Sequence, residues 1–277
     1  MRKIICRAAL MLALCLPVCA LAATEPNAKT IEDTTTYEGD TIKITIDQWC
    51  YAFNRTNLRF FVANVYVSDP AQMQTAFAGE QYSKNNAEAT SAIAERHDAI
   101  LAINGDYYGA QERGYVLRNG VLYRASAQSG TDALVIGTDG NFRIINEGET
   151  SADTLVREGA WQVLTFGPAL INGGQVTVSS SDEIGRAMTS NPRTAIGQIS
   201  EGHYLLVVSD GRTKESTGLS LRQLAELMQS LGAQIAYNLD GGGSSTMVFQ
   251  GRVVNNPTTN GRSIRERSVS DIVYIGY

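Results

Sequence analysis

The residues best suited to chemistry in this sequence follow an apolar segment near the C-terminal end. The stretch "AYNLDGGGSSTM", residues 236–247, runs from apolar residues through Asn238 and Asp240 into three glycines and three hydroxyls. A tight hairpin needs only one or two residues with positive φ, so a third glycine needs another reason. Glycine-rich turns expose successive N–H groups that bind anions. The stretch therefore predicts a cradle for a phosphate or a sugar oxygen beside Asp240, with a flexible loop as the alternative.

Other polar residues also stand where apolar segments begin or end. They follow "AILAI" and "LLVV" or lie in "NPRT", and they are Asn104, Asp106, Arg193, Thr194, Asp210 and Arg212. Each one alone fits an ordinary turn. Strands of one sheet can bring their ends together at one rim, where sites are commonly built. We therefore expect these groups to meet.

The expected site has two classes of residue. The candidate catalytic residues are Asp240, Asp210 and Asp106. Arg193 would supply a bidentate contact to phosphate. The candidate substrate-binding residues are Asn104, Arg193, Thr194, Arg212, Asn238, Gly241, Gly242, Gly243, Ser244 and Ser245.

The sequence lacks the residues that several classes of reaction require. The chain has two histidines, His97 and His203, so a Ser-His-Asp or Cys-His triad is not expected. It has no HExxH motif and no Cys/His cluster, and we expect no metal and no cofactor. A single divalent cation held by Asp and Asn oxygens stays compatible with the sequence.

The N-terminal sequence indicates export. Residues 1–22 contain a basic start, an apolar stretch and the Ala20-Leu-Ala22 signal, which is typical of a secretory signal peptide. We expect a periplasmic or extracellular protein without a transmembrane span in the mature chain. Lipidation at Cys19 is disfavoured, because Val18 precedes it where a small residue is wanted. The formal net charge of −5 argues against nucleic acid as a partner.

Alternating strand patterns and hairpin turns dominate the remaining chain. Residues 23–40 are polar and Thr-rich, which predicts a loose N-terminal lead. Residues 85–98 and 218–233 have helical patterns, and Ser220 can cap the second. We predict an α+β fold with a mixed, largely antiparallel sheet, two or three helices packed on it, and a single domain over residues 41–277.

Six segments resemble the phosphodiester glycosidase family. They occur in the family's order and are "NGDYY" (104–108), "GPALI" (167–171), "NPRTAIG" (191–197), "SDGR" (209–212), "GLSLRQLAELMQSLGAQIAYNLDGGGSSTMV" (218–248) and "RSVSDIVYI" (267–275). The resemblance implies hydrolysis of a sugar-1-phosphodiester, with cleavage of the anomeric C–O bond and release of a sugar such as N-acetylglucosamine. The family often has Gly-Gly-Phe-Phe where this chain has residues 105–108, which leaves open whether Asp106 has a role shared with the family. Which aspartate would be nucleophile or base, and whether the enzyme retains or inverts, stays open.

Two other functions compete with this hydrolase. One is a carbohydrate-binding, exopolysaccharide or cell-wall assembly protein that uses the same cleft without turnover. The combination of Asp240, Asp210 and Arg193 favours activity, because a binding protein has no need for all three. The other is a phosphodiesterase that cuts the P–O bond, which would normally need a metal centre.

Overall fold

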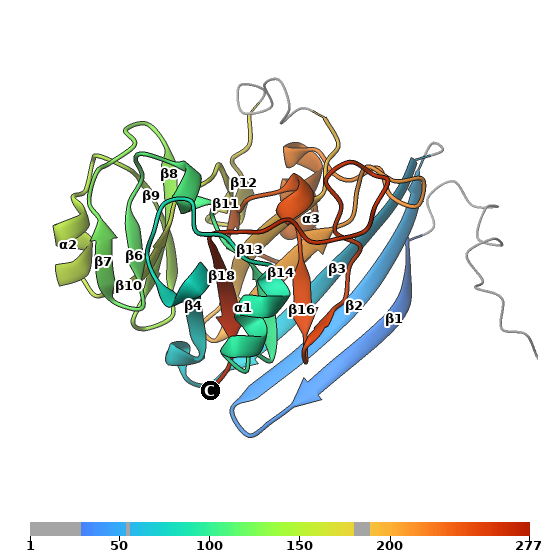
Figure 1. Ribbon diagram of the computed structural model, residues 1–277, viewed down its shortest axis with the longest axis horizontal. Coiled ribbons are helices and arrows are strands. Elements are labelled where there is room, and N and C mark those ends of the chain that lie inside the picture. The colour runs from blue at the N-terminus through green and yellow to red at the C-terminus, as the bar shows by residue number, and fades with distance from the viewer. Residues whose placement is uncertain (1–28, 54–55, 180–188) are drawn as a thin grey trace, which may run out of the picture.

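The computed structural model describes residues 29–53, 56–179 and 189–277 (Figure 1). The predicted signal peptide over residues 1–22 lies outside the described residues, as does the first part of the predicted lead.

The largest sheet has eight strands. In their order across the sheet they are β1 (Lys29–Glu38), β2 (Ile42–Phe53), β3 (Thr56–Val67), β14 (His203–Ser209), β13 (Arg193–Ser200), β15 (Ile235–Asn238), β11 (Ala169–Asn172) and β12 (Gln175–Val176). Figure 1 shows β1, β2 and β3 side by side as the longest strands of the molecule. The prediction of a loose lead is wrong for residues 29–38, because this polar segment pairs with β2 along its length. Its hydrogen bonds to β2 do not require apolar side chains.

Two further sheets have five strands each. The first contains β7 (Val121–Arg124), β6 (Val116–Arg118), β10 (Ala160–Leu164), β8 (Asp132–Gly137) and β9 (Phe142–Asn146). The second contains β17 (Arg252–Val253), β16 (Met247–Phe249), β5 (Leu101–Asn104), β18 (Asp271–Ile275) and β4 (Met73–Phe77). Every pairing between these strands in the described residues is antiparallel, which confirms a largely antiparallel α+β fold. The predicted strands divide among three sheets instead of forming one mixed sheet.

Three α-helices cover these sheets in the described part of the chain. They are α1 (Thr90–Arg96), α2 (Ala152–Arg157) and α3 (Leu221–Ser230), and the short 3₁₀ turns are η1 (Pro70–Gln72), η2 (Ala78–Glu80), η3 (Tyr108–Ala110) and η5 (Gly242–Ser244). Ser220 caps α3 and forms a capping box with Gln223, which confirms the predicted start. None of the described helices has the length and apolar character needed to cross a membrane.

The core lies between the largest sheet and the sheet that contains β5. Facing side chains from both sheets form one buried cluster, which includes Ile44, Phe61, Leu206, Ile103, Met247 and Val273. The opposite face of the largest sheet is covered by α3, and the opposite face of the β5 sheet by α1. β5 is therefore buried on both faces, which explains its uninterrupted apolar sequence.

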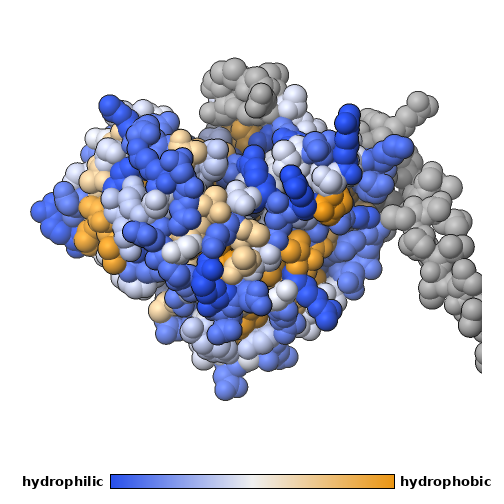
Figure 2. Space-filling model, viewed as in Figure 1, coloured by the Kyte–Doolittle hydropathy of each residue, from blue (hydrophilic) through white to orange (hydrophobic). Residues whose placement is uncertain are grey.

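The face of the molecule that Figure 2 shows is mainly polar. Figure 2 shows apolar residues gathered in small separate patches on this face. One patch lies where Figure 1 places β7 and α2, and these elements carry the exposed residues Val121, Tyr123 and Val156. Patches of this size are ordinary for a globular protein.

Candidate active site

The predicted polar residues meet where strands from the two packed sheets end. In the largest sheet, Arg193 at the start of β13 pairs with Ser209 at the end of β14, and Asn238 at the end of β15 pairs with Ala195. In the β5 sheet, Asn104 at the end of β5 pairs with Ile272 near the start of β18. The structure thus brings these strand ends to one rim.

Asn104 joins the two sheets at this rim. Its Nδ2 donates to the Asp240 carbonyl at 2.7 Å, and its Oδ1 accepts from Thr194 Oγ1 at 2.8 Å and from the Thr246 amide at 3.3 Å. Asn104 and Thr194 are both fully buried. Their polar atoms are engaged within the protein, so they hold the rim together and do not face solvent.

The Asp240 carboxylate is paired with Arg267. Asp240 is 7% exposed, and its Oδ2 accepts from Arg267 Nη2 at 2.9 Å. Arg267 Nε also donates to Ser244 Oγ at 2.8 Å, and the Arg267 guanidinium lies 5.9 Å from the ring centroid of Tyr107. Burial raises the pKa of Asp240, whereas hydrogen bonds from Ser244 and the charge of Arg267 lower it in part. The raised pKa suits a carboxyl group that exchanges protons.

The three glycines after Asp240 have a packing reason. A Cβ at Gly241 would lie 2.9 Å from the Pro192 carbonyl oxygen, and a Cβ at Gly243 would overlap the Thr259 hydroxyl. Gly242 has a φ of +63°, and a Cβ there would lie 2.9 Å from Arg212 Nη2. Protein atoms thus fill the space where a side chain would stand, so packing already accounts for the three glycines, and the cradle for a phosphate or sugar oxygen stays a prediction. The Gly242 amide donates to Pro192 O at 2.8 Å, so this N–H is engaged within the protein.

The two predicted arginines, Arg193 and Arg212, also lie against this loop. Arg212 is exposed, and its Nη1 donates to Thr259 O at 2.7 Å and its Nη2 to Asn191 Oδ1 at 3.0 Å. Arg193 is buried, and its Nε donates to Leu219 O at 2.9 Å. Its Cδ would lie 3.9 Å from a Cβ at Gly241. Three guanidinium-bearing side chains, including Arg267, thus surround the glycine loop.

Asp210 is connected to the glycine loop through Asn255. Its Oδ1 accepts from the Asn256 amide at 2.8 Å and from Asn255 Nδ2 at 3.4 Å. Asn255 Nδ2 also donates to Ser245 O at 2.9 Å, which connects Asp210 to the glycine loop. Burial raises the pKa of Asp210. Asp210 is therefore buried and bonded to protein groups, and its catalytic role stays a prediction.

Asp106 lies in a buried ion cluster behind Tyr107. Its Oδ2 is 2.9 Å from Arg118 Nη2, and the same nitrogen is 2.9 Å from Asp271 Oδ2. All three side chains are buried, and one guanidinium faces two carboxylates. Burial and the nearby Asp106 raise the pKa of Asp271 to about 7. Asp106 thus has a structural place in this cluster, and its catalytic role stays a prediction.

The remaining predicted residues line the inner side of the glycine loop. Ser244 is buried against Arg267, and Asn238 Nδ2 donates to Gly167 O at 2.7 Å. Asn238 Oδ1 and Ser245 Oγ, two polar atoms of predicted residues, are buried without a hydrogen-bond partner among the described residues. Buried polar atoms without partners are uncommon and often mark a functional site.

Two residues of the site were not predicted. Arg267 and the 41% exposed Tyr107 complete the surroundings of Asp240. Both belong to segments that carry the family resemblance, "RSVSDIVYI" and "NGDYY". The segments were therefore a usable signal, but nothing local to residue 267 indicates that it pairs with Asp240.

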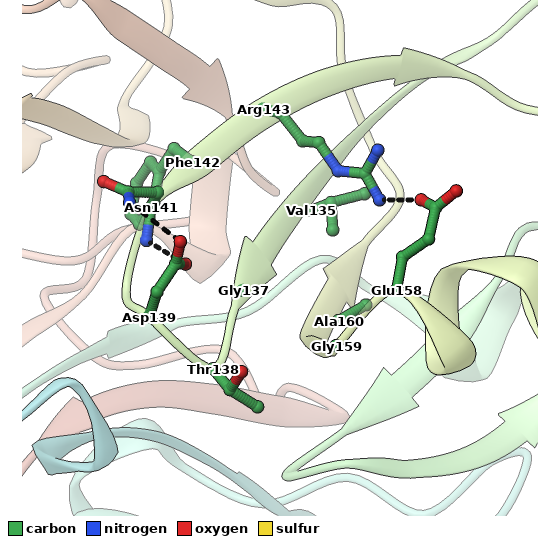
Figure 3. A pocket seen from close by; sticks show the side chains of 10 residues that line it. All are labelled: Val135, Gly137, Thr138, Asp139, Asn141, Phe142, Arg143, Glu158, Gly159 and Ala160. Carbon is green, nitrogen blue, oxygen red and sulfur yellow. Dashed lines mark hydrogen bonds and ion pairs between the residues drawn. The ribbon is translucent and has the colours of Figure 1, made fainter.

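A hollow of about 320 Å³ lies elsewhere, at the β8–β9 hairpin (Figure 3). Its charged groups are satisfied by one another, since Arg143 Nη2 bonds Glu158 at 2.6 Å and Asp139 bonds the Asn141 amide at 2.9 Å. Figure 3 shows these pairs on its two sides. We place the candidate chemistry at Asp240, because the hollow offers no comparable carboxylate with surrounding cations.

The carboxylates of the site do not form a metal-binding group. Within residues 29–53, 56–179 and 189–277, no three His, Cys, Asp or Glu side chains are arranged to hold a metal ion.

Known proteins resemble this chain in both sequence and fold. Residues 97–276 match the phosphodiester glycosidase family. The SPbeta prophage-derived uncharacterized protein YomE of Bacillus subtilis (strain 168) is 30% identical over 201 residues, which are 71% of this chain and 31% of that protein. The N-acetylglucosamine-1-phosphodiester alpha-N-acetylglucosaminidase of Mus musculus is 42% identical over 66 residues, which are 24% of this chain and 13% of that protein. This chain thus covers less than a third of either curated relative.

Solved structures share the fold. The catalytic domain of the zebrafish N-acetylglucosamine-1-phosphodiester alpha-N-acetylglucosaminidase, auto-inhibited by its pro-peptide, has a TM-score of 0.70 at 20% identity and aligns over 92% of this chain and 89% of that chain. A hypothetical protein from Synechocystis has a TM-score of 0.66 at 15% identity, over 88% of this chain and 63% of that chain. At these identities the likeness concerns the fold.

The first prediction tests how Gly242 shapes the site. Gly242→Ala should cost about 1–2 kcal/mol of unfolding free energy from left-handed strain and also displace the Arg212 guanidinium. Gly130→Ala is the matched control, because Gly130 has a φ of +80° and no atom near its Cβ position. Urea unfolding and phosphate titration measure the two effects. Equal phosphate affinity in both variants would contradict a role for Arg212 in anion binding.

The second prediction concerns the buried ion cluster. Arg118→Met leaves Asp106 and Asp271 without a cation, which should cost about 3–5 kcal/mol at pH 8. The cost should be smaller at pH 5, because Asp271, with its pKa near 7, is then protonated.

The direction of the pH dependence of stability follows from Asp271 in the wild type. In the folded state Asp271 keeps its proton up to about pH 7, whereas in the unfolded state it releases the proton above about pH 4. The proton on Asp271 therefore contributes to the free energy of unfolding at low pH, and this contribution is lost as the pH rises through 7. Urea unfolding at both pH values measures it, with the surface variant Arg157→Met as control. Equal losses in Arg118→Met at pH 5 and pH 8 would exclude carboxylate ionisation as the cause.

Proposed function

This chain belongs to the phosphodiester glycosidase family, and we propose that it hydrolyses the glycosidic C–O bond of a sugar-1-phosphodiester at the Asp240 site. The observation that carries the proposal is the position of the Asp240 carboxylate. It lies at the rim between two sheets, 2.9 Å from Arg267 Nη2, with Arg193 and Arg212 packed against the adjoining glycines. N-acetylglucosamine is the sugar that the names of the mammalian relatives suggest.

The arginines suit the leaving group of this reaction. A phosphate monoester leaves as an anion and needs charge stabilisation more than protonation. Fixed donors aimed at developing charge are typically the largest contribution to such catalysis. The exposed guanidinium of Arg212 is already held by Thr259 and Asn191, so it loses little freedom when it binds an anion. Arg193 and Arg267 would extend this positive field around the phosphate.

Asp240 suits the sugar side of the bond. A carboxylate stabilises the oxocarbenium-like transition state and acts as nucleophile in retaining enzymes or as base in inverting ones. Asp240 is the most exposed of the three aspartates, and it pairs with Arg267 beside the glycine loop, so we assign the reacting role to Asp240. The anomeric configuration of the first product, followed by NMR, distinguishes the two mechanisms.

The third prediction removes the reacting carboxylate. Asp240→Asn keeps the shape of the side chain but loses its charge, so kcat should fall by on the order of 10²-fold or more with little change in Tm. Turnover of UDP-N-acetylglucosamine and of the methyl phosphodiester of N-acetylglucosamine 1-phosphate provides the measurement, with the exposed Asp153→Asn as control.

The bond that breaks is identified in the same assay. In ¹⁸O water, C–O cleavage places the label in the sugar, and label in the phosphate would instead indicate a phosphodiesterase. Normal binding of both compounds without turnover by the wild type would favour the carbohydrate-binding alternative.

The fourth prediction uses the Arg267 contact. If ionised Asp240 is the active form, kcat/KM falls as the pH drops through the raised pKa of Asp240. Arg267→Gln removes a positive charge that lowers this pKa, so the acid limb should move to higher pH, whereas Arg267→Lys should keep it near the wild-type position. An unchanged acid limb in Arg267→Gln would assign the limb to another group.

A further inference from the structure

The segment between β17 and β18 carries positive charge in an acidic protein. We call residues 254–270 the arginine loop. Three arginines and one glutamate give it a net charge of +2, which leaves −7 for the rest of a chain whose net charge is −5. Figure 1 shows this dark orange to red segment crossing the front of the molecule between β17 and β18. A cationic segment in such a chain indicates local attraction for anions.

The arginine loop is packed against the glycine loop of the candidate site. Arg212 Nη1 donates to Thr259 O at 2.7 Å, and the Arg267 amide donates to Gly243 O at 3.2 Å. Gly261 lies against the carbonyl of Arg212, because a Cβ at Gly261 would overlap that oxygen. These contacts fix the arginine loop beside Asp240.

Two arginines of this loop, Arg262 and Arg265, are exposed. Arg262 directly follows Gly261, and Arg265 is two residues from Arg267, which corresponds to at most about 7 Å of chain. Neither guanidinium has a hydrogen bond or ion pair with any residue that the structure describes. Both charges are thus available on the same loop as Arg267, the residue that pairs with Asp240.

The single acid of the arginine loop does not neutralise them. Both carboxylate oxygens of Glu266 accept hydrogen bonds from Ser91, one from its amide at 2.9 Å and one from its hydroxyl. Glu266 is therefore directed toward α1, where Ser91 lies. The outward charge of the loop remains positive.

We propose that Arg262 and Arg265 form a second anion-binding subsite for the leaving-group side of the substrate. The leaving group then carries a further anionic group, a second phosphate or a carboxylate, beyond the phosphate at the scissile bond. This inference rests on the proposed function for the identity of its ligand. Arg193, Arg212 and Arg267 contact the first phosphate, and the two loop arginines contact the next anion. The substrate class is accordingly a sugar-1-phosphodiester of a polyanionic molecule, such as a sugar pyrophosphate or a phosphate-linked polymer.

A titration tests the subsite without relying on turnover. Arg262→Gln/Arg265→Gln and the wild type are titrated calorimetrically with sodium tripolyphosphate and with inorganic phosphate at low ionic strength. The loop variant should bind tripolyphosphate on the order of tenfold more weakly, with less than about a twofold change for inorganic phosphate. The control Arg143→Gln/Arg157→Gln removes the same charge from β9 and α2, and should change neither affinity by more than about twofold.

Three results would overturn the subsite. They are an absence of tripolyphosphate binding to the wild type, wild-type affinity in the loop variant, and an equal loss in the control variant. Turnover adds a separate result: the KM for UDP-N-acetylglucosamine should rise more in the loop variant than the KM for the methyl phosphodiester of N-acetylglucosamine 1-phosphate. If the wild type hydrolyses neither compound, the proposed function fails, while the titration still decides whether the subsite exists.

Discussion

The side-chain amide of Asn104 is the contact on which the geometry of the site depends. It joins the end of β5 to Thr194 in β13, to the Asp240 carbonyl after β15 and to the Thr246 amide before β16. Replacing Asn104 by an apolar residue would leave these buried partners without a hydrogen bond, and each unsatisfied group would lower the free energy of unfolding by about 1–3 kcal/mol. Because the two sheets are fixed to each other at this point, Asp240 and the glycine loop have a defined position without a ligand. Electrostatic catalysis requires this preorganisation.

Two groups of paired charges lie next to the segment that carries Tyr107. On one side Arg267 lies near the Tyr107 ring and binds Asp240. On the other side, Asp106 and Asp271 share Arg118 in the interior. A buried ion pair contributes little net stability, but removing one member is costly, so the cluster fixes the backbone of residues 104–108 more than it stabilises the fold. The conformation of Tyr107, with its φ of +66°, depends on this support.

The glycine loop illustrates how packing and function coincide. Its glycines are needed because Pro192, Arg212 and Thr259 approach the backbone too closely for a side chain. The same approach brings the Arg212 guanidinium beside the loop and places the arginine loop over it. Positive charge therefore gathers around Asp240 as a consequence of how tightly these segments pack. A larger residue in the loop would move the charges as well as strain the backbone.

The sequence by itself determined most of the secondary-structure elements and most residues of the candidate site. Strand alternation, the Ser220 cap of α3 and the polar residues at the ends of apolar segments depend on neighbours in the chain, so they were predictable. Only the tertiary structure decided which carboxylate remains at the rim. Asp106, Asp210 and Asp240 look alike in sequence, since each comes after or within the end of an apolar segment. Their carboxylates nevertheless have distant partners, because Asn255 and Asn256 lie 45 and 46 residues from Asp210, and Thr165 lies 59 residues from Asp106. Burial and charge pairing are set by such distant contacts, as are the strand β1 and the Arg267 partner of Asp240, and no local pattern encodes them.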